Sequence, residues 1–469
     1  MSEHDVTPVP DSSESFFGHP KGLFYLAFTE AWERFSYYGM TALLVLYMVN
    51  QVLLPGHVEN VVGFDGFRTA LESVVGPLSP LALASQLFGL YAGFVYFTPV
   101  LGGMIADRWT GQRNAVVIGA LLMSAGHIAM AFDQTFLLAL LLLILGSGFL
   151  KGNISAQVGA LYPIDDEARR TRGFAIFSMA INFGAVCGPL LCGFLAHYYG
   201  WHYGFGVSAI FMLAGLVTYL SGYRHLPARV ERRDKVSENL SAADWRIIRV
   251  LFVVMLITIF QSASYYQIAN VFQVWVQEHV NLSVGSLSIP IAWYQSIDPL
   301  VSILAVPLLF GIWQFQESRR GEPSDLGKIG VGAWLAATAN LILVVAIVSS
   351  GGEPIHPLWP ALYCAGLGVA FLYYWPTLLA LVSRAAPASA NATMMGVTFL
   401  TLFIANNLVG WIGRFYEQMS PTMFWIMHAA IAASGGILVM VFGRRITRAL
   451  HVEEPQPMRP SAMTIEVER

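Results

Sequence analysis

The sequence contains twelve predominantly apolar stretches, each at least about twenty residues long, which is the length that a helix needs to cross a bilayer. Because lipid offers no hydrogen-bond partners, stretches of this kind predict helices rather than loops or open sheets. The stretches form two sets of six. The predicted spans are 22–52, 81–107, 113–132, 136–160, 171–197 and 203–224, followed by 245–276, 288–316, 327–350, 357–383, 391–416 and 421–443.

The composition leads to the same fold class. Of the 469 residues, 56% are hydrophobic and 12% are charged, whereas a soluble domain has roughly 25% charged residues. We therefore predict an all-α membrane protein with many spans. Cys187, Cys192 and Cys364 lie in predicted spans without C-x-x-C spacing, so we expect no disulfide framework and no metal site. The polar, acidic first twenty residues lack the basic region of a signal peptide, so the first span is expected to be retained.

A charged break at 225–244 separates the two sets of spans and predicts two bundles. The predicted parts are an N-terminal tail at 1–21, a six-helix bundle at 22–224, a linker at 225–244, a second six-helix bundle at 245–446 and a tail at 447–469. Within the first bundle, residues 53–80 form a long connection with an amphipathic stretch, in which Phe64, Phe67 and Leu71 share one side. We expect a short helix there, on the outer surface.

Lysine and arginine predict the orientation, because they gather in the connections on the cytoplasmic side of a membrane protein. Thirteen of them lie in alternate connections, whereas the opposite side has Arg68 and Arg414 and little else. Both termini are therefore expected in the cytoplasm. Two six-helix halves with a cytoplasmic linker are the layout of the major facilitator fold, which holds its substrate near the midplane.

One predicted span carries charge. Glu30, Glu33 and Arg34 are followed by three hydroxyl residues at helical spacing, so all six share one stripe: Glu30, Glu33, Arg34, Tyr37, Tyr38 and Thr41. A charge at the bilayer centre costs about 2.5–3.5 kcal/mol, so this stripe predicts a polar interior or tight internal pairing. The alternative is that these groups extend to the membrane surface, but apolar residues continue on both sides of them.

Two further ionisable groups, Lys151 and Asp298, lie deep in predicted spans. Glu30, Glu33, Arg34 and Lys151 sum to zero charge. If Lys151 meets the stripe, protonation of one carboxylate leaves a net positive site that suits a substrate carboxylate. The alternative for Lys151 is a static ion pair, and the alternative for Asp298 is a helix-capping role beside Pro299.

Several motifs carry a family resemblance. The run EAWERFSYYGM, residues 30–40, resembles the ExxERFxYYG signature of the proton-coupled oligopeptide transporters, a branch of the major facilitator superfamily. The segments FLKGNISAQVG, FAIFSMAINFG, IPIAWYQSIDP and NLVGWIG are similar to segments of the fourth, fifth, eighth and eleventh helices of that family. GMIADRWTGQR resembles the superfamily loop between helices two and three, which implies a conformational latch at Asp107 and Arg108.

The resemblance implies which residues act. Proton coupling is expected from Glu30, Glu33, Arg34, Lys151 and Asp298. The substrate site is expected to include Arg34, Tyr37, Tyr38, Thr41, Tyr96, Lys151, Asn182, Tyr265, Tyr266, Gln295, Asp298, Asn407 and Trp411. Arg34 and Lys151 would hold the peptide carboxylate, and Asn182, Asn407 and Asp298 the amino end.

The sequence also departs from the family pattern. Thr41 replaces a second arginine, and Ser178 a tyrosine. In the second half, Tyr266 and Phe371 replace two acidic residues, and Asp298 stands where asparagine is usual. Asp298 is therefore the candidate to restore a negative charge there.

We expect a symporter that imports di- and tripeptides across the inner membrane, driven by the proton gradient and without a cofactor. Its partners would be short peptides, protons and membrane lipid, with no nucleic acid, and it is expected to be a monomer. One alternative is a transporter of the same fold for another small anion or zwitterion. Another is a non-transporting nutrient sensor. An enzyme is disfavoured because no nucleophile–base or metal-ligand motif is found in the sequence.

Overall fold

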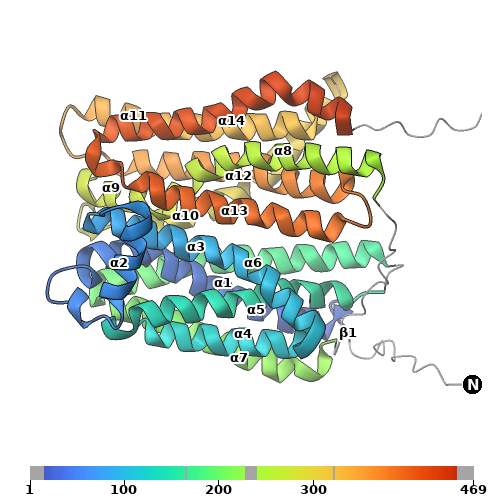
Figure 1. The fold of residues 1–469 in the computed structure, drawn as a ribbon, viewed down its shortest axis with the longest axis horizontal. Coiled ribbons are helices and arrows are strands. Elements are labelled where there is room, and N and C mark those ends of the chain that lie inside the picture. Colours follow the sequence, from blue (N-terminus) through green and yellow to red (C-terminus); the bar gives the residue numbers. More distant parts are fainter. Residues whose placement is uncertain (1–14, 164–165, 228–239, 321–322, 451–469) are drawn as a thin grey trace, which may run out of the picture.

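A computed structural model describes residues 15–163, 166–227, 240–320 and 323–450. Of the predicted linker, only 225–227 and 240–244 are described. Of the two predicted tails, only 15–21 and 447–450 are described. The described chain is almost entirely helical, and its helices run roughly parallel to the long axis of the molecule (Figure 1).

The first half begins with a two-stranded antiparallel hairpin and continues with six long helices. Its elements are β1 (Ser15–Phe16), β2 (His19–Pro20), α1 (Lys21–Tyr47), η2 (Met48–Val52), η3 (Val58–Asn60), α2 (Phe64–Val75), α3 (Pro80–Ile105), η4 (Ala106–Thr110), α4 (Gly111–Ala129), η5 (Asp133–Thr135), α5 (Phe136–Ala160), α6 (Glu167–Tyr199), α7 (Trp201–Gly222) and η6 (Tyr223–His225). The predicted connection 53–80 contains η3 and the short helix α2.

The second half repeats this architecture, with one helix interrupted. Its elements are α8 (Ala242–Tyr265), η7 (Tyr266–Ala269), α9 (Val271–His279), β3 (Ser283–Val284), β4 (Leu287–Ser288), η8 (Ile291–Trp293), α10 (Tyr294–Arg320), α11 (Asp325–Ser350), α12 (Leu358–Ala385), α13 (Asn391–Gly413), η9 (Tyr416–Gln418) and α14 (Pro421–Leu450). The predicted span 245–276 is divided in the structure, because Asn270 (φ −119°, ψ −116°) leaves the helical region between η7 and α9.

The described helices agree with the predicted number of membrane crossings. Ten segments are long and apolar enough to cross a membrane. One of them, 80–129, contains both α3 and α4, and α1 is a further helix of 27 residues. The protein is therefore an integral membrane protein with two helical bundles, in which α1 packs on α6 and α7 in the first, and α11 packs on α12 and α14 in the second.

Glycines allow α1 and α6 to touch backbone to backbone. A Cβ atom on Gly184 would lie 2.5 Å from the carbonyl oxygen of Ala31, and one on Gly188 would lie 2.4 Å from that of Phe35. Contacts of this kind replace the hydrophobic drive that is missing between helices in lipid. They bury the charged stripe of α1 inside the first bundle.

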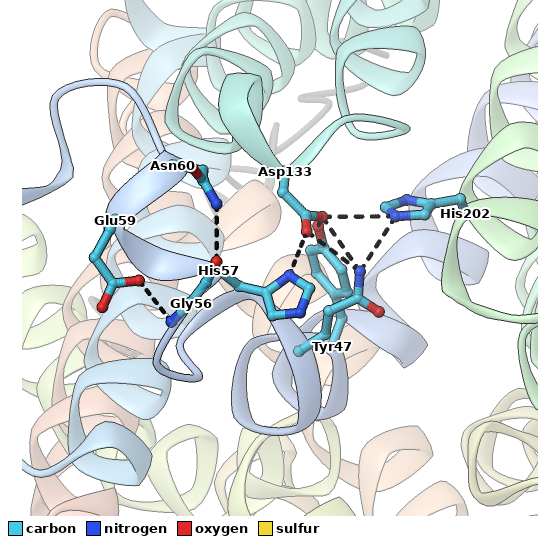
Figure 2. A network of polar contacts seen from close by, with 8 residues as sticks. Tyr47, Gly56, His57, Glu59, Asn60, Asp133 and His202 are labelled. Atoms are coloured by element: carbon cyan, nitrogen blue, oxygen red, sulfur yellow. Dashed lines mark hydrogen bonds and ion pairs between the residues drawn. The ribbon is translucent and has the colours of Figure 1, made fainter.

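A polar network fixes the end of the molecule that carries α2, here called the α2 end (left in Figure 1; Figure 2). The carboxylate of Asp133 accepts hydrogen bonds from the Tyr47 hydroxyl (2.5 Å), the Gln51 amide and His57 Nδ1 (3.0 Å), and His202 Nε2 lies 3.6 Å away. Because these groups come from α1, η2, the following loop and α7, the network ties the long loop before α2 to the bundle.

The two bundles are joined at the α2 end. Among the described residues, the parts of α3, α6 and α13 that form hydrogen bonds between the bundles lie toward α2, whereas 98–105, 167–181 and 391–402 form none. Loops and short helices at the same end add further bonds. The pairs are Asn50–Gln277, Ser79–Glu417, Ser85–Gly410, Ser85–Asn270, Tyr96–Tyr266, Arg414–Val75, Tyr198–Ser288, Trp293–Leu190 and Ser296–Val186. The opposite end, where β1 and the end of α14 lie, lacks such bonds among the described residues (Figure 1).

The contact between α3 and α13 generates a prediction about this junction. A Cβ atom on Gly89 would lie 2.5 Å from the Asn406 carbonyl oxygen and 2.8 Å from Gly410 Cα, which are backbone atoms of the other bundle. Overpacking of this kind costs roughly 1–3 kcal/mol. Gly89→Ala should therefore shift the protein toward a state in which the two bundles are separated at the α2 end.

Spin labels on the exposed residues Glu59 and Ser286 would measure this separation. The short-distance population should fall in Gly89→Ala. Gly206→Ala is the matched control, because a Cβ atom on Gly206 has nothing within 4 Å. Identical distance distributions in the parent and Gly89→Ala would mean that the α3–α13 contact does not hold this end closed.

Candidate functional site

The charged stripe of α1 forms a buried cluster. Arg34 Nε lies 2.9 Å from Glu30 Oε1 and 2.5 Å from Glu33 Oε2, and the Glu33 side chain has no exposed surface. Neither contact has hydrogen-bond geometry, and Glu30 Oε2 and Glu33 Oε1 are buried without a hydrogen-bond partner among the described residues. One guanidinium thus faces two carboxylates in a place where unpaired charge is costly.

Lys151 of α5 reaches this stripe through an aromatic ring. Its Nζ lies 4.2 Å from the centroid of the Tyr37 ring and 5.4 Å from that of Tyr96, and Arg34 Cζ lies 5.6 Å from the Tyr37 ring. The ring of Tyr37 therefore contacts both cations through its negative face. Lys151 has no carboxylate within ion-pair distance in the described part of the chain, so the alternative of a static ion pair finds no partner there.

Tyrosines connect the two bundles beside this cluster. The hydroxyls of Tyr96 (α3) and Tyr266 (η7) lie 3.3 Å apart, and the rings of Tyr37 and Tyr38 pack edge to face at 5.1 Å. Thr41 is buried and donates its hydroxyl to the Tyr37 carbonyl oxygen (3.0 Å), so its hydrogen is used inside its own helix. The site thus has hydroxyl groups from both halves.

The second half contributes a carboxylate from α10. Asp298 Oδ2 accepts a hydrogen bond from the Tyr265 hydroxyl. The ring of Tyr265 stacks on that of Phe371 at a centroid distance of 5.4 Å. Asp298 Oδ1 is buried and has no hydrogen-bond partner among the described residues. Among the described residues, no backbone N–H donates a hydrogen bond to Asp298. A helix-capping role would require such a bond. The free oxygen remains available as an acceptor.

The remaining predicted residues differ in their surroundings. Asn182 of α6 has no hydrogen-bond partner in the described residues, and Gln295 Nε2 of α10 is buried without one. Asn407 donates to the Phe403 carbonyl oxygen in its own helix (2.8 Å) and faces Gly93 of α3. Trp411 is 45% exposed and packs on Phe415. The substrate role of these four side chains stays a prediction.

The predicted latch lies on η4, at the end of the first bundle that is opposite the α2 end. Asp107 and Arg108 are both exposed, and Asp107 accepts a hydrogen bond from the side-chain amide of Gln112 (3.0 Å). The two residues form no ion pair with the rest of the described chain. Since the bundles are not hydrogen-bonded at this end, the latch also stays a prediction.

Sequence reasoning did not single out the junction between Ser85 and Asn270. Asn270 Nδ2 donates to Ser85 Oγ (2.8 Å), so the break between η7 and α9 is held against α3 of the other bundle. Broken helices of this kind mark binding regions in transporters. The available signal was a polar set inside an apolar stretch, Gln267, Asn270 and Gln273, at a spacing of three residues.

Known proteins are similar in sequence over most of their length. The family model of the Major Facilitator Superfamily matches residues 35–410. The uncharacterized transporter YclF of Bacillus subtilis is 29% identical, over 94% of this chain and 96% of its own. The peptide transporter YePEPT of Yersinia enterocolitica is 28% identical, over 91% and 94%.

Solved structures agree with these relatives. The crystal structure of the peptide transporter POT in complex with sulfate has a TM-score of 0.81 and 27% identity, and the match covers 93% of this chain and 96% of that one. The fold, the family model and the relatives lead to one assignment. The chain belongs to the Major Facilitator Superfamily, and its resemblance to the proton-coupled oligopeptide transporters is confirmed.

Proposed function

We propose that this protein is a proton-coupled symporter that imports di- and tripeptides across the inner membrane by alternating access. The observation that carries the proposal is the buried cluster of Glu30, Glu33 and Arg34, adjoined by Lys151, in a chain similar to peptide transporters. Buried carboxylates next to fixed cations can change protonation as access to water changes. The proton gradient then supplies the energy, and no cofactor is needed.

The proton step follows from charge. When both glutamates are ionised, Glu30, Glu33, Arg34 and Lys151 are neutral as a set. Protonation of one carboxylate leaves a net positive charge, which favours a peptide carboxylate near Arg34 and Lys151. Binding of proton and peptide would then support each other, as reciprocal coupling requires.

The amino end of the peptide is assigned to the second half. Asp298 Oδ1 is a buried acceptor without a partner among the described residues, and Phe371 offers no charge beside it. An ammonium group entering such a region needs a counter-charge, because its lost hydration is otherwise uncompensated. Asn182 and Asn407 would add hydrogen bonds there. A cavity with opposite charges at its two ends suits short zwitterions with varied side chains.

The junction at the α2 end supports a conformational assignment. We take the described state to be open toward the cytoplasm, with both termini and the latch of Asp107 and Arg108 on that side. The clusters of lysine and arginine in alternate connections support this orientation. The protein would act as a monomer, since the site is built within one chain.

A second candidate is a transporter of the same fold for another small anion or zwitterion. Tyr266 and Phe371 favour it, because they leave Asp298 as the carboxylate of the second-half site. Competition of unlabelled dipeptides against other small solutes would separate the two. A nutrient sensor, by contrast, would bind peptides without moving them.

The first prediction concerns the driving force. Purified protein in liposomes should accumulate dialanine when the outside is more acidic than the inside. With one proton per peptide, a difference of one pH unit can support roughly tenfold accumulation, because it is worth about 1.4 kcal/mol. A protonophore should abolish the accumulation. Equal uptake with and without the gradient, for every peptide tried, would contradict symport.

Glu33→Gln should separate coupling from exchange. The amide resembles the protonated acid, so the site can still bind peptide but can no longer release the proton. Accumulation should fall to the equilibrium level, while counterflow of labelled peptide against unlabelled peptide persists. The exposed Glu59→Gln serves as control. Full concentrative uptake by Glu33→Gln would move the proton role to Glu30.

Asp298→Asn should weaken binding of peptides with a free amino group. A hydrogen bond to a charged group contributes about 1.5–3 kcal/mol, so affinity should fall by roughly ten- to a hundredfold. N-acetylated peptides should lose much less. Tyr265→Phe is the matched control, because it removes the hydrogen bond to Asp298 and keeps the carboxylate. Equal binding of both peptide classes by the parent and Asp298→Asn would make Asp298 structural or a second proton site.

A further inference from the structure

A cavity of about 310 Å³ lies in the seam between the two bundles, toward the α2 end. One wall comes from α6 with Val186 and Leu190. The other wall comes from η8 and α10, with Ile297 and Leu300, and from the beginning of α12 with Ala361. None of its lining residues is charged, and none belongs to the predicted substrate site.

The hydrogen-bonding side chains that line the cavity already have partners. Trp293 Nε1 donates to the Leu190 carbonyl oxygen (2.9 Å), and Ser296 Oγ donates to that of Val186 (2.7 Å), both across the seam. The Tyr294 hydroxyl donates to the Pro357 carbonyl oxygen (3.1 Å). Their hydrogens are therefore not available to a polar occupant, and the other side chains that line the cavity are apolar. This lining favours an apolar occupant.

The cavity is lined by exposed leucines and by no residue of the charged cluster. Leu190 and Leu300 line it and are 37% and 42% exposed, and Leu304, one turn further along α10, is 67% exposed. All three lie in segments that are long and apolar enough to cross a membrane. Exposed leucines in such segments suit contact with the hydrocarbon of a bilayer.

We propose that the acyl chain of a bilayer lipid occupies this cavity. An apolar cavity of about 150 Å³ is enough to bind benzene, so the present cavity can hold a longer hydrocarbon segment. Because its walls come from both bundles, the chain buries apolar surface against both of them only while the α2 end is joined. The lipid therefore favours that conformation. This preference rests on the proposed alternating access, whereas the binding itself does not.

Photo-crosslinking tests the binding. The protein in nanodiscs would receive phosphatidylcholine with a diazirine in its acyl chain, and the labelled residues would be mapped by mass spectrometry. Labelling should be stronger at the partly buried Ile297 and Ala361 than at Met440, which is 71% exposed on α14. Labelling that simply follows exposure would overturn the proposal.

A cavity-filling variant provides the second arm. Ala361→Phe should reduce labelling at Ile297 by at least about fivefold, whereas Leu304→Phe, which adds the same ring outside the cavity, should not. If Ala361→Phe does not fold, Leu300→Trp fills the mouth from the other wall. Unchanged labelling at Ile297 in a folded filling variant would refute an acyl-chain site. This measurement requires no transport, so it stands apart from the test of symport.

The conformational effect has its own measurement. In detergent, added dioleoyl phosphatidylcholine should increase the short-distance population between spin labels at Glu59 and Ser286. Glycerophosphocholine, which has the headgroup without acyl chains, should have no effect. The response should disappear in Ala361→Phe and persist in Leu304→Phe. A response to the headgroup alone, or an equal response in both variants, would contradict selection of the joined state by the acyl chain.

Discussion

The buried contacts of Arg34 with Glu30 and Glu33 place a constraint on the whole first bundle. Charges at this depth cannot face lipid, so α1 must be enclosed by other helices. The glycines of α6 bring that helix against the backbone of α1, and α7 packs on another side. The cluster is therefore enclosed within the first bundle. A site that excludes lipid and keeps unpaired carboxylate oxygens is suited to hold a proton.

The cluster also explains why aromatic rings surround it. Lys151 would add a second cation near Arg34, and two like charges repel in a low-dielectric region. The ring of Tyr37 interacts with both. Lys151 is thus held beside two aromatic rings and has no ion-pair partner among the described residues. Replacing Tyr37 by an aliphatic residue would remove this arrangement.

The sequence predicted the helices and the charged stripe because both follow from local periodicity. Helical spacing places Glu30, Glu33 and Arg34 on one side of α1, and hydropathy identifies the spans whatever their neighbours are. Periodicity does not identify partners in other helices. The position of Lys151 over Tyr37, and the Tyr265 hydrogen bond to Asp298, depend on how α5, α8 and α10 pack, so they needed the structure.

The break at Asn270 was missed for a different reason. Hydropathy averages over about twenty residues, so one residue outside the helical region does not interrupt an apolar run. The polar residues Gln267 and Gln273 on either side of Asn270 carried the only local signal. For Trp411, which is 45% exposed, the matching segment predicts the helix but not the direction in which the side chain points, so its role stays a prediction.

The junction between the bundles must be stable and yet easily reversed. Its hydrogen bonds are mostly between neutral groups, such as the reciprocal amide pair of Asn50 and Gln277, and each contributes about 0.5–1.5 kcal/mol. Such bonds can be exchanged for water when the end opens. Buried ion pairs in the same place would leave uncompensated charge on separation, at a cost of about 3–5 kcal/mol for each broken pair. The buried contacts of Arg34 with Glu30 and Glu33 lie within α1, whereas most hydrogen bonds across the seam join neutral groups. The α2 end can therefore open without breaking the charged cluster.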